Sequence, residues 1–522
     1  MKMALKKLCS YGTSVLILLC LTTVSVYADV TLPALIDHHM VIQRGVEFPV
    51  WGWAVPGERV TVDFNGQTVS CSAGSDGLWK VMLKPMKAGG PHTMTIRGNN
   101  TIVLYNILIG DVWICSGQSN MVWPVKYCDN ADKEIASATH PKLRLVEVKK
   151  TGRGAPQDDI EGQWRECTPH SVGDITGVGY FFCRDLMKEL DVPIGLVMSA
   201  WGGTSIQQWT SRRAMESDPE TAPILEWYRP VLDENPRSMN EYYDGLAGWF
   251  EYCFVQMHLK RSYNPIPEPP EEYKGMGGTP SWLYNGMIAP LVWMPIKGFA
   301  WYQGESDSGN GYLYRRQLPL LIEDWRRAWG RGDLPFLIVQ LANWQKRETE
   351  PGDSAPAELR EAQLMTALNT PNTALAVTLD LGEEDVHFRA KQPAGERLMK
   401  AALKIAYGRD IPWSGPVYTS MKVSSGRVRL SFDHAESGLM SPDGAPLKGF
   451  AIAGSDRKFV WAEARIEGNE VVVWSDEVKN PASVRYGWGR NPEVNLYNKD
   501  GLPASPFRTD SWPGVTKRNS KK

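Results

Sequence analysis

Apolar and polar residues alternate along the segment from residue 29 to 106, a pattern typical of half-buried β-strands. Arg59–Phe64 alternates, and Asn65–Gly66 after it supplies a hairpin turn. Trp79–Leu83 and His92–Arg97 predict further strands, separated by glycine and proline residues. We therefore predict a small N-terminal β-sandwich domain.

The pattern changes near Ile107, where short apolar runs begin to alternate with helical periodicity. Five runs are typical of buried strands: Asp111–Cys115, Ile194–Ser199, Lys297–Tyr302, Pro335–Leu341 and Thr373–Leu379. Apolar residues at three- and four-residue spacing predict three helices, at Tyr180–Leu190, Tyr312–Trp329 and Gly395–Tyr407. Alternating strands and helices predict a parallel sheet covered on both faces, so we assign residues 107–410 to an α/β domain.

Two other stretches depart from the α/β pattern. Residues 215–284 carry helical signals and a proline-rich segment, and we expect this insertion to pack as a cap or flank. A β pattern returns over residues 411–512, where Phe459–Ile466 and Glu470–Trp474 flank a Gly-Asn hairpin turn. Residues 513–522 form a basic tail, of which Lys517–Lys522 are expected to be a disordered end.

The first 28 residues have the three-part pattern of a secretory signal peptide. Lysines come first, then the apolar run Val15–Leu21, then small residues around Val26–Ala28. The apolar stretch is short for a membrane anchor, and Leu19 before Cys20 departs from the usual lipid-attachment pattern. We therefore expect an exported protein, periplasmic or extracellular, and whether Cys20 carries a lipid stays open.

Composition excludes some classes of function. The net charge of −2 shows no excess of basic residues of the kind that nucleic-acid-binding proteins carry. The six cysteines after the leader are irregularly spaced, without a Cys-x-x-Cys pair, so we predict no metal site and leave disulfide pairing open. The number of tryptophans, 21, is high, and tryptophans are found in sugar-stacking surfaces as well as in ordinary hydrophobic cores.

Candidate chemistry gathers after the predicted strands, where open parallel sheets bind ligands. The strand ends deliver Ser116-Gly-Gln118-Ser119-Asn120, Trp201-Gly202-Gly203-Thr204, Tyr302-Gln303-Gly304-Glu305, Ala342-Asn343-Trp344, and Asp380 with Glu384-Asp385-Val386-His387. This set holds a nucleophile, glycine amides, a carboxamide, acids and an imidazole, the parts that acyl transfer needs. Of the eight histidines, only His387 follows such a strand with carboxylates two and three residues before it.

The segment Gly117-Gln-Ser-Asn-Met121 is not the Gly-x-Ser-x-Gly elbow of α/β-hydrolases. Its order with Trp201-Gly-Gly-Thr204, Trp301-Tyr-Gln-Gly-Glu-Ser306 and an acid before His387 resembles the SGNH hydrolases, and within them the sialate O-acetylesterase family. Further segments extend the resemblance over nearly the whole chain after the leader: Asp37–Gln43, Pro49–Ala54, Leu283–Leu291, Asp324–Arg326 and Leu359–Gln363.

The resemblance implies a flavodoxin-like α/β/α core with a parallel sheet, flanked by an N-terminal β-sandwich and a C-terminal β domain, and no cofactor. It implies Ser119 as nucleophile and His387 as base. It places the oxyanion donors at the backbone amides of Ser119 and of Gly202 or Gly203, with the Gln303 side chain.

Substrate contacts and the triad acid are less defined. We assign Gln118, Asn120 and Glu305 to substrate binding, with Glu305 either contacting sugar hydroxyls or orienting the site. Both Glu384 and Asp385 are candidates for the acid. Glu384 has the family's spacing of three residues and Asp385 has its usual residue type, and the spacing favours Glu384.

We expect hydrolysis of O-acetyl esters on sialic acids or related sugars. An acetylxylan or other polysaccharide acetylesterase is an alternative, because acetyl transfer uses the same residues whichever sugar carries the group. A non-catalytic glycan-binding protein is an alternative of another class. The expected partner is an O-acetylated sugar or glycan, with no nucleic acid and no membrane span, and the sequence does not indicate an oligomeric state.

Overall fold

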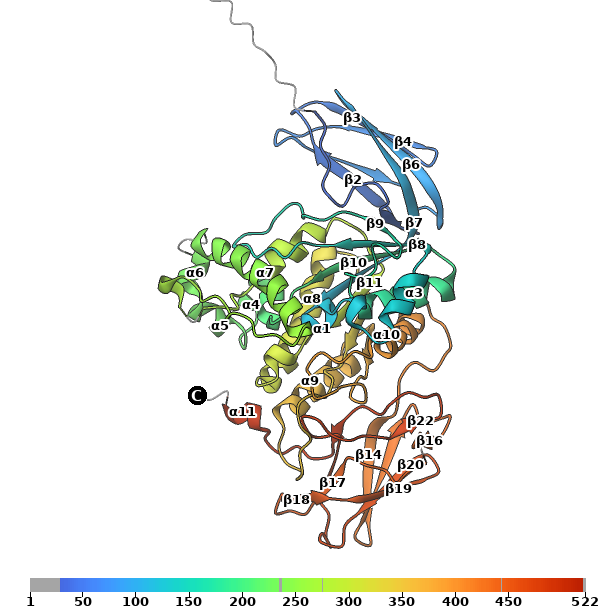
Figure 1. Ribbon diagram of the computed structural model, residues 1–522, viewed down its shortest axis with the longest axis vertical. Coiled ribbons are helices and arrows are strands. Elements are labelled where there is room, and N and C mark those ends of the chain that lie inside the picture. Colours follow the sequence, from blue (N-terminus) through green and yellow to red (C-terminus); the bar gives the residue numbers. More distant parts are fainter. Residues whose placement is uncertain (1–28, 234–236, 275, 443, 520–522) are drawn as a thin grey trace, which may run out of the picture.

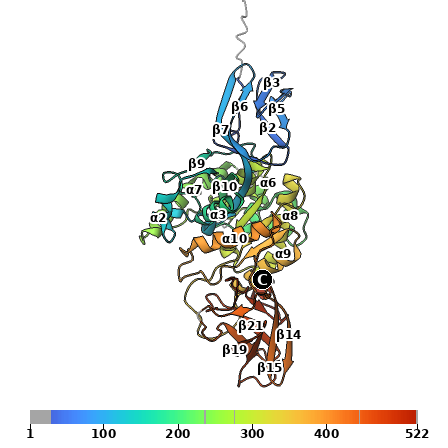
Figure 2. The ribbon, with the colours of Figure 1, turned by 90° about the vertical axis from the view of Figure 1, so that its right-hand side faces the viewer.

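The computed structural model describes residues 29–233, 237–274, 276–442 and 444–519. The predicted leader, residues 1–28, lies outside them. Figure 1 and Figure 2 show three parts in a column along the longest axis: N-terminal strands, a central sheet with helices, and C-terminal strands. The fold is a mixed α/β one with a largely parallel central sheet and several small antiparallel sheets.

The central sheet has the strand order β13-β12-β11-β7-β10-β8-β9. These strands are β7 (Thr101–Gly117), β8 (His140–Glu147), β9 (Arg165–Cys167), β10 (Ile194–Ala200), β11 (Gly298–Tyr302), β12 (Phe336–Val339) and β13 (Thr373–Ala376). Every pair along this order is parallel except β8–β9. All five predicted strands are confirmed, whereas β8 and β9 were not predicted.

Helices cover both faces of this sheet, as predicted. On one face, α3 (Gly177–Leu190) and α10 (Lys391–Ile405) share a core with Cys115 and Ala300. On the other, α8 (Gly311–Trp329) and α9 (Ala355–Asn369) pack against the alternate strand residues, including Ile114 and Phe299. The three predicted helices correspond to α3, α8 and α10, and α9 is a helix that the periodicity missed.

Strand β7 belongs to two parts of the molecule. Its first half pairs with β6 (Gly89–Arg97) and β1 (Val41–Gln43), and its second half with β10 and β11. The boundary expected between residues 106 and 107 therefore falls inside one continuous strand. The change of partners occurs between Gly110, which pairs with β1, and Asp111, which pairs with β10.

The predicted N-terminal strands are confirmed. β3 (Arg59–Phe64) and β4 (Gln67–Ser72) form a hairpin on Asn65–Gly66, where both φ angles are positive, as a tight hairpin turn requires. β2 (Phe48–Trp53) pairs with β5 (Leu78–Leu83) as a separate two-stranded sheet.

The C-terminal part contains two four-stranded antiparallel sheets, β14-β15-β20-β19 and β18-β17-β21-β23, and a pair β16–β22. Their bounds are β14 Val417–Ser424, β15 Arg427–Asp433, β16 Leu439–Met440, β17 Phe450–Ala453, β18 Phe459–Trp461, β19 Glu463–Glu467, β20 Glu470–Trp474, β21 Ser483–Tyr486, β22 Tyr497–Asn498 and β23 Phe507–Arg508. The predicted hairpin is confirmed as β19–β20. The single strand predicted over Phe459–Ile466 is wrong, because the chain changes sheets at Ala462 and β18 pairs with β17.

The disorder expected at the C-terminal end is wrong for residues 517–519, which belong to α11 (Val515–Asn519), and residues 520–522 lie outside the described residues. Thr516 donates through its backbone N–H and its hydroxyl to Glu358 of α9, so the end of the chain is anchored on the central part.

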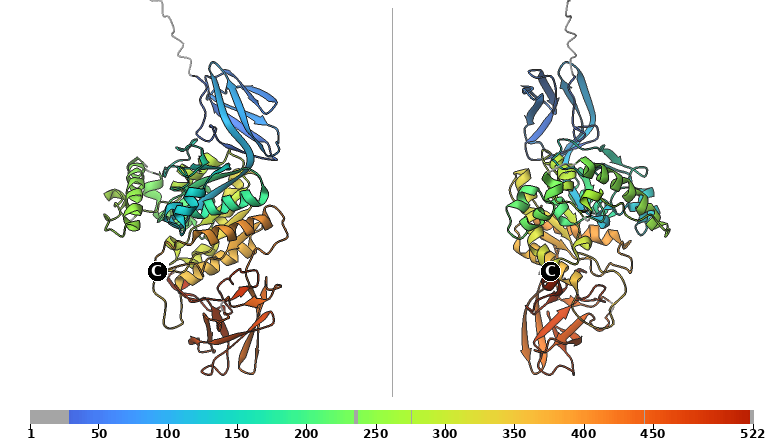
Figure 3. Two further views of the ribbon diagram at one scale, coloured as in Figure 1. Left: turned by 45° about the vertical axis from the view of Figure 1, so that its right-hand side comes forward. Right: turned by 90° about the vertical axis from the view of Figure 1, so that its left-hand side faces the viewer.

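The expected insertion contains α5 (Ala222–Trp227), α6 (Arg229–Asp233) and α7 (Arg237–His258), and α4 (Arg212–Glu216) overlaps its start. In the left view of Figure 3 these helices stand to one side of the sheet. In the described part of the chain, no helix combines the length and the apolar character needed to cross a membrane. The six cysteines after the leader are all free.

Candidate active site

Ser119 is the first residue of the short helix α1 (Ser119–Val122), directly after the central strand β7. The turn before it needs glycine at position 117, where φ is 134° and an added Cβ would lie 2.0 Å from the Tyr302 carbonyl oxygen. The N–H groups of a first helical turn have no partner within the helix. The sequence thus places a serine hydroxyl beside free amides at the carboxyl edge of the sheet.

A glycine turn after β10 lies against this serine. A Cβ added at Gly202 would lie 3.0 Å from the Ser119 Cβ and 2.3 Å from Phe250 of α7. Gly203 has a φ of 69°, a left-handed conformation that favours glycine. Within the described residues, the N–H groups of Gly202 and Gly203 have no hydrogen-bond partner. They are therefore available to a negatively charged oxygen next to Ser119.

His387 lies in a nearly closed aromatic environment. Its ring stacks on Trp123 at a centroid distance of 5.0 Å, and Phe254 of α7 contacts it edge-on at 5.8 Å. Its Nε2 is buried and finds no hydrogen-bond partner among the residues that the structure covers. Burial, with the nearby Lys391 ammonium, lowers the pKa of His387 to about 4, while Asp385 opposes this shift. The imidazole is therefore neutral near pH 7 and can accept a proton.

Of the two acids considered for the triad, Asp385 lies against the imidazole. Its Oδ1 accepts the His387 backbone N–H at 2.9 Å and lies 3.7 Å from Nδ1. Glu384 contributes its backbone carbonyl to the N–H of Gln345. The three-residue spacing favoured Glu384, but the backbone of this loop turns so that the Asp385 side chain lies beside the imidazole. The Asp385 side chain is 66% exposed, so its electrostatic effect on the histidine is screened by solvent.

The third acid near this loop has other partners. Asp380 forms a bidentate ion pair with Arg397 of α10, at 2.6 and 2.7 Å, and accepts the Tyr497 hydroxyl at 2.8 Å. Asp380 therefore links α10 to the C-terminal part, and of these acids Asp385 is the one beside the imidazole.

Asn120 and Glu305 belong to a buried polar cluster behind the nucleophile. Asn120 donates from Nδ2 to Glu305 and to the Val386 carbonyl, and accepts the Lys391 ammonium at 2.6 Å. Burial lowers the pKa of Lys391 to about 7 and raises that of Glu305. Lys391 also lies 3.5 Å above the Phe388 ring centroid. The cluster joins the segment after Ser119 to the segment that carries His387.

Gln118 also has internal partners. Its side-chain oxygen faces the N–H groups of Gly304 and Ser306 at 3.4 and 3.3 Å, and the residue is only 2% exposed. Asn120 thus engages both ends of its side chain inside the protein, whereas Glu305 Oε2 is buried and has no hydrogen-bond partner in the described structure.

Gln303 uses both of its amide hydrogens inside the protein. Nε2 donates to the Thr204 carbonyl at 3.0 Å and to Asp307 at 2.6 Å, and Oε1 accepts the Tyr314 hydroxyl at 2.8 Å. Burial raises the pKa of Asp307 to about 6. In this arrangement Gln303 supports the turn Gly202–Thr204 from behind.

Four residues near the site were missed from the sequence: Trp123, Phe250, Phe254 and Lys391. Trp123 stands one helical turn after Ser119, which is a signal that could have been used. The phenylalanines come from the insertion, and a buried lysine carries no sequence signal. No cluster of three or more potential metal-ligating side chains occurs within the described ranges.

Comparison with known proteins covers this whole region. The family model "Carbohydrate esterase, sialic acid-specific acetylesterase" matches residues 109–243 and 276–404. These ranges include the segments that carry Ser119, Gly202, Gln303 and His387.

Relatives match most of the chain. The sialate O-acetylesterase of Mus musculus is 31% identical over 524 residues, covering 90% of this chain and 93% of that protein. The sialate O-acetylesterase of Pongo abelii is 30% identical, covering 92% and 93%. The crystal structure of a carbohydrate acetylesterase from Xanthomonas citri has a TM-score of 0.79 and 36% identity, and covers 93% of this chain and 100% of that chain.

Proposed function

Because the chain belongs to the sialic acid-specific acetylesterase family of carbohydrate esterases, we propose that it removes O-acetyl groups from sugars through an acetyl-enzyme on Ser119. Membership makes it an ester hydrolase. The observations that support the residue assignment are the free glycine amides beside Ser119 and the hydrogen bond that joins Asn120, the residue after Ser119, to Val386, the residue before the neutral His387.

In the proposed first step, the Ser119 hydroxyl attacks the acetyl carbonyl while His387 Nε2 takes its proton. The histidine then returns the proton to the sugar oxygen as the ester bond breaks. Water repeats the sequence on the acetyl-enzyme and releases acetate. The low pKa of His387 supports this role, since an imidazolium could not act as base.

The negative charge on the carbonyl oxygen needs hydrogen-bond donors that are already in place. We assign this role to the backbone N–H groups of Ser119 and Gly202, with Gly203 as the alternative glycine. Because both amide hydrogens of Gln303 are engaged elsewhere, we give Gln303 the supporting role of holding the glycine turn.

For the acid that orients His387 we choose Asp385 over Glu384. Its oxygen is 3.7 Å from Nδ1, and a small rotation of an exposed side chain would bring it within hydrogen-bond distance. To Asn120, Glu305 and Lys391 we assign positioning of the two catalytic segments, and to Gln118 support of the turn after β11.

The finer description of the fold is also our inference. Ser119 follows the central parallel strand, with helices on both faces of the sheet, which supports a flavodoxin-like SGNH core. We retain the division into residues 29–106, 107–410 and 411–512, with β7 passing through the first boundary. Export through cleavage after Ala28 is a proposal that N-terminal sequencing of the secreted protein would test.

The substrate class can be tested directly. Acetate release is measured from O-acetylated sialic acids, from acetylated xylan and from p-nitrophenyl acetate, with the Ser119→Ala variant as control. We expect release from O-acetylated sialic acid, in keeping with the names of the mammalian relatives. Release from xylan alone would make the protein a polysaccharide acetylesterase, and no release from any acetylated sugar would contradict the proposal.

A further inference from the structure

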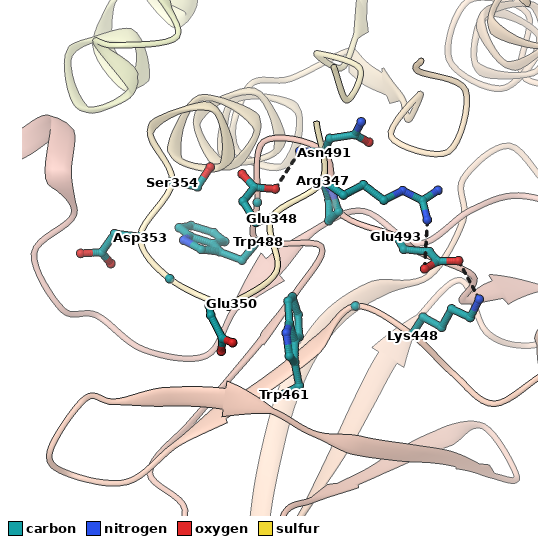
Figure 4. A pocket seen from close by; sticks show the side chains of 14 residues that line it. Arg347, Glu348, Glu350, Asp353, Ser354, Lys448, Trp461, Trp488, Asn491 and Glu493 are labelled. Carbon is teal, nitrogen blue, oxygen red and sulfur yellow. Dashed lines mark hydrogen bonds and ion pairs between the residues drawn. The ribbon is translucent and has the colours of Figure 1, made fainter. Parts of the chain in front are cut away.

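A hollow of about 340 Å³ lies where the loop of residues 347–354 meets the C-terminal strands (Figure 4). This volume falls within the roughly 300–1,000 Å³ that is typical of small-molecule sites. Its walls come from two parts of the chain: the loop contributes carboxylates, and the C-terminal part contributes two tryptophans. None of these residues takes part in the esterase chemistry described above.

Trp461, the last residue of β18, forms one wall as a fixed aromatic ring. Its indole N–H donates to the Thr349 carbonyl at 2.8 Å, yet the residue remains 44% exposed. Figure 4 shows the ring beside the hollow, next to Glu350. A held aromatic ring with an exposed face can pack against the C–H face of a pyranose and loses little conformational entropy on binding.

Trp488 also lines the hollow. The residue is 7% exposed, and in the described structure its buried indole N–H has no hydrogen-bond partner. Such groups are rare in folded proteins, because a buried donor without an acceptor costs free energy. An oxygen of a bound ligand or an ordered water would satisfy it.

The charges around the hollow favour a neutral, hydroxyl-rich ligand. Four carboxylates line it: Glu348, Glu350, Asp353 and Glu493. The two cations that line it, Arg347 and Lys448, both pair with Glu493, at 3.0 and 2.6 Å. Among the described residues, Glu350 has no partner for its carboxylate. A free carboxylate accepts hydrogen bonds from hydroxyl groups and repels acidic sugars, whereas the carboxylate of Asp353 is paired with Arg485 at 3.1 Å.

We propose that this hollow is a second carbohydrate-binding site, which holds a neutral sugar residue of a glycan. The proposal rests on the proposed function for the chemical class of its ligand, a carbohydrate, but not for any catalytic step. The loop at this site is hydrogen-bonded to the catalytic loop, since the Gln345 N–H donates to the Glu384 carbonyl at 3.0 Å.

Isothermal titration calorimetry on the full-length Ser119→Ala variant tests this site without turnover. The probes are acetyl-free xylohexaose, cellohexaose and mannohexaose, with sialyllactose as the acidic probe. We expect at least one neutral hexasaccharide to bind and sialyllactose to bind at least tenfold more weakly. Adding Trp461→Ala should weaken neutral binding at least tenfold, and Glu350→Gln about tenfold, the effect of one lost hydrogen bond to a charged group.

Trp227→Ala is the matched control, since Trp227 is 64% exposed but lies outside the hollow, and its binding should equal that of the parent. Hydrolysis of p-nitrophenyl acetate, measured with Ser119 restored, should be unchanged in all three variants, which separates this site from the esterase. Should Trp461→Ala not fold, Glu350→Gln and Trp461→Phe carry the test, the latter retaining a ring and most of the binding. Absence of binding up to about 10 mM, equal binding by Trp461→Ala, or preference for sialyllactose would overturn the proposal.

Discussion

Asn120 donates a hydrogen bond from its side-chain amide to the Val386 carbonyl at 3.0 Å. The donor follows the proposed nucleophile in sequence and the acceptor precedes the proposed base. This single bond therefore joins two catalytic segments that are more than 260 residues apart in the chain. Lys391 holds the same side chain from its other end.

Removing this link should slow catalysis without removing any reacting group. We expect Asn120→Ala to lower kcat for p-nitrophenyl acetate by ~10², the cost of a small misplacement of a catalytic group, with a smaller change in KM. Steady-state kinetics with circular dichroism check this. A variant with normal kcat would show that the two segments hold their positions without the bond.

The two acids beside His387 should respond differently to conversion into amides. Asp385→Asn should lower kcat by ~10², less than the ~10⁴ seen for a buried triad acid, because this carboxylate is largely exposed. Glu384→Gln should stay within about twofold of the parent, since only its backbone has a partner in this loop. If Glu384→Gln lowered kcat more than Asp385→Asn did, Glu384 would be the acid that orients His387.

Activity should persist at unusually low pH. The base must be neutral, and the pKa of His387 is lowered to about 4, so kcat/KM should hold down to about pH 5 and fall only below that. An ordinary histidine would lose activity near pH 6.5. An acid limb near 6.5 in the parent enzyme would contradict the assignment.

The cause of the low pKa can be tested on the same profile. Lys391→Met removes the cation that helps to depress the pKa of His387, so the acid limb should move to higher pH. Lys400→Met, on the same helix and paired with Glu396, is the matched control and should leave the profile in place.

Gln303 should behave as a structural residue. Gln303→Ala removes one hydrogen bond each from the Thr204 carbonyl, the Asp307 carboxyl and the Tyr314 hydroxyl, which should lower the free energy of unfolding by about 1–3 kcal/mol. We expect kcat to fall by less than the ~10²–10³ that a lost oxyanion donor costs. Denaturant unfolding and kcat should be measured on one preparation of this variant. A fall in kcat of ~10²–10³ at an unchanged free energy of unfolding would show that Gln303 donates to the oxyanion instead.

The pattern of apolar residues was sufficient to predict the elements whose buried residues recur at the regular spacing of a strand or a helix. It missed α9 because that helix buries polar residues, among them Arg360, which donates to the carbonyls of Leu341 and Ala342. It missed β8 because Arg144 interrupts the apolar run, although Arg144 is 2% exposed and pairs with Glu166. In both cases a polar residue can be buried because it binds partners that are distant in the sequence. The spacing of apolar residues gives no information about those partners.

The sequence also indicated the candidate residues of the site, whose roles stay predictions. Ser119, the glycine turn and His387 follow from the rule that parallel strands gather ligands at their carboxyl ends. The choice between Glu384 and Asp385 depends on backbone dihedral angles within one loop. The internal bonds of Gln303 and the two phenylalanines of α7 depend on contacts between distant segments.

The central claim is that Ser119 forms the acetyl-enzyme, and hydrolysis by Ser119→Ala tests it most directly. Ser119 is only 6% exposed, and alanine removes just its hydroxyl, so the substitution should leave the fold intact by circular dichroism and thermal unfolding. We predict that the folded variant releases no acetate from p-nitrophenyl acetate or from O-acetylated sialic acid above the uncatalysed rate. Near-normal turnover by the folded variant would contradict the account.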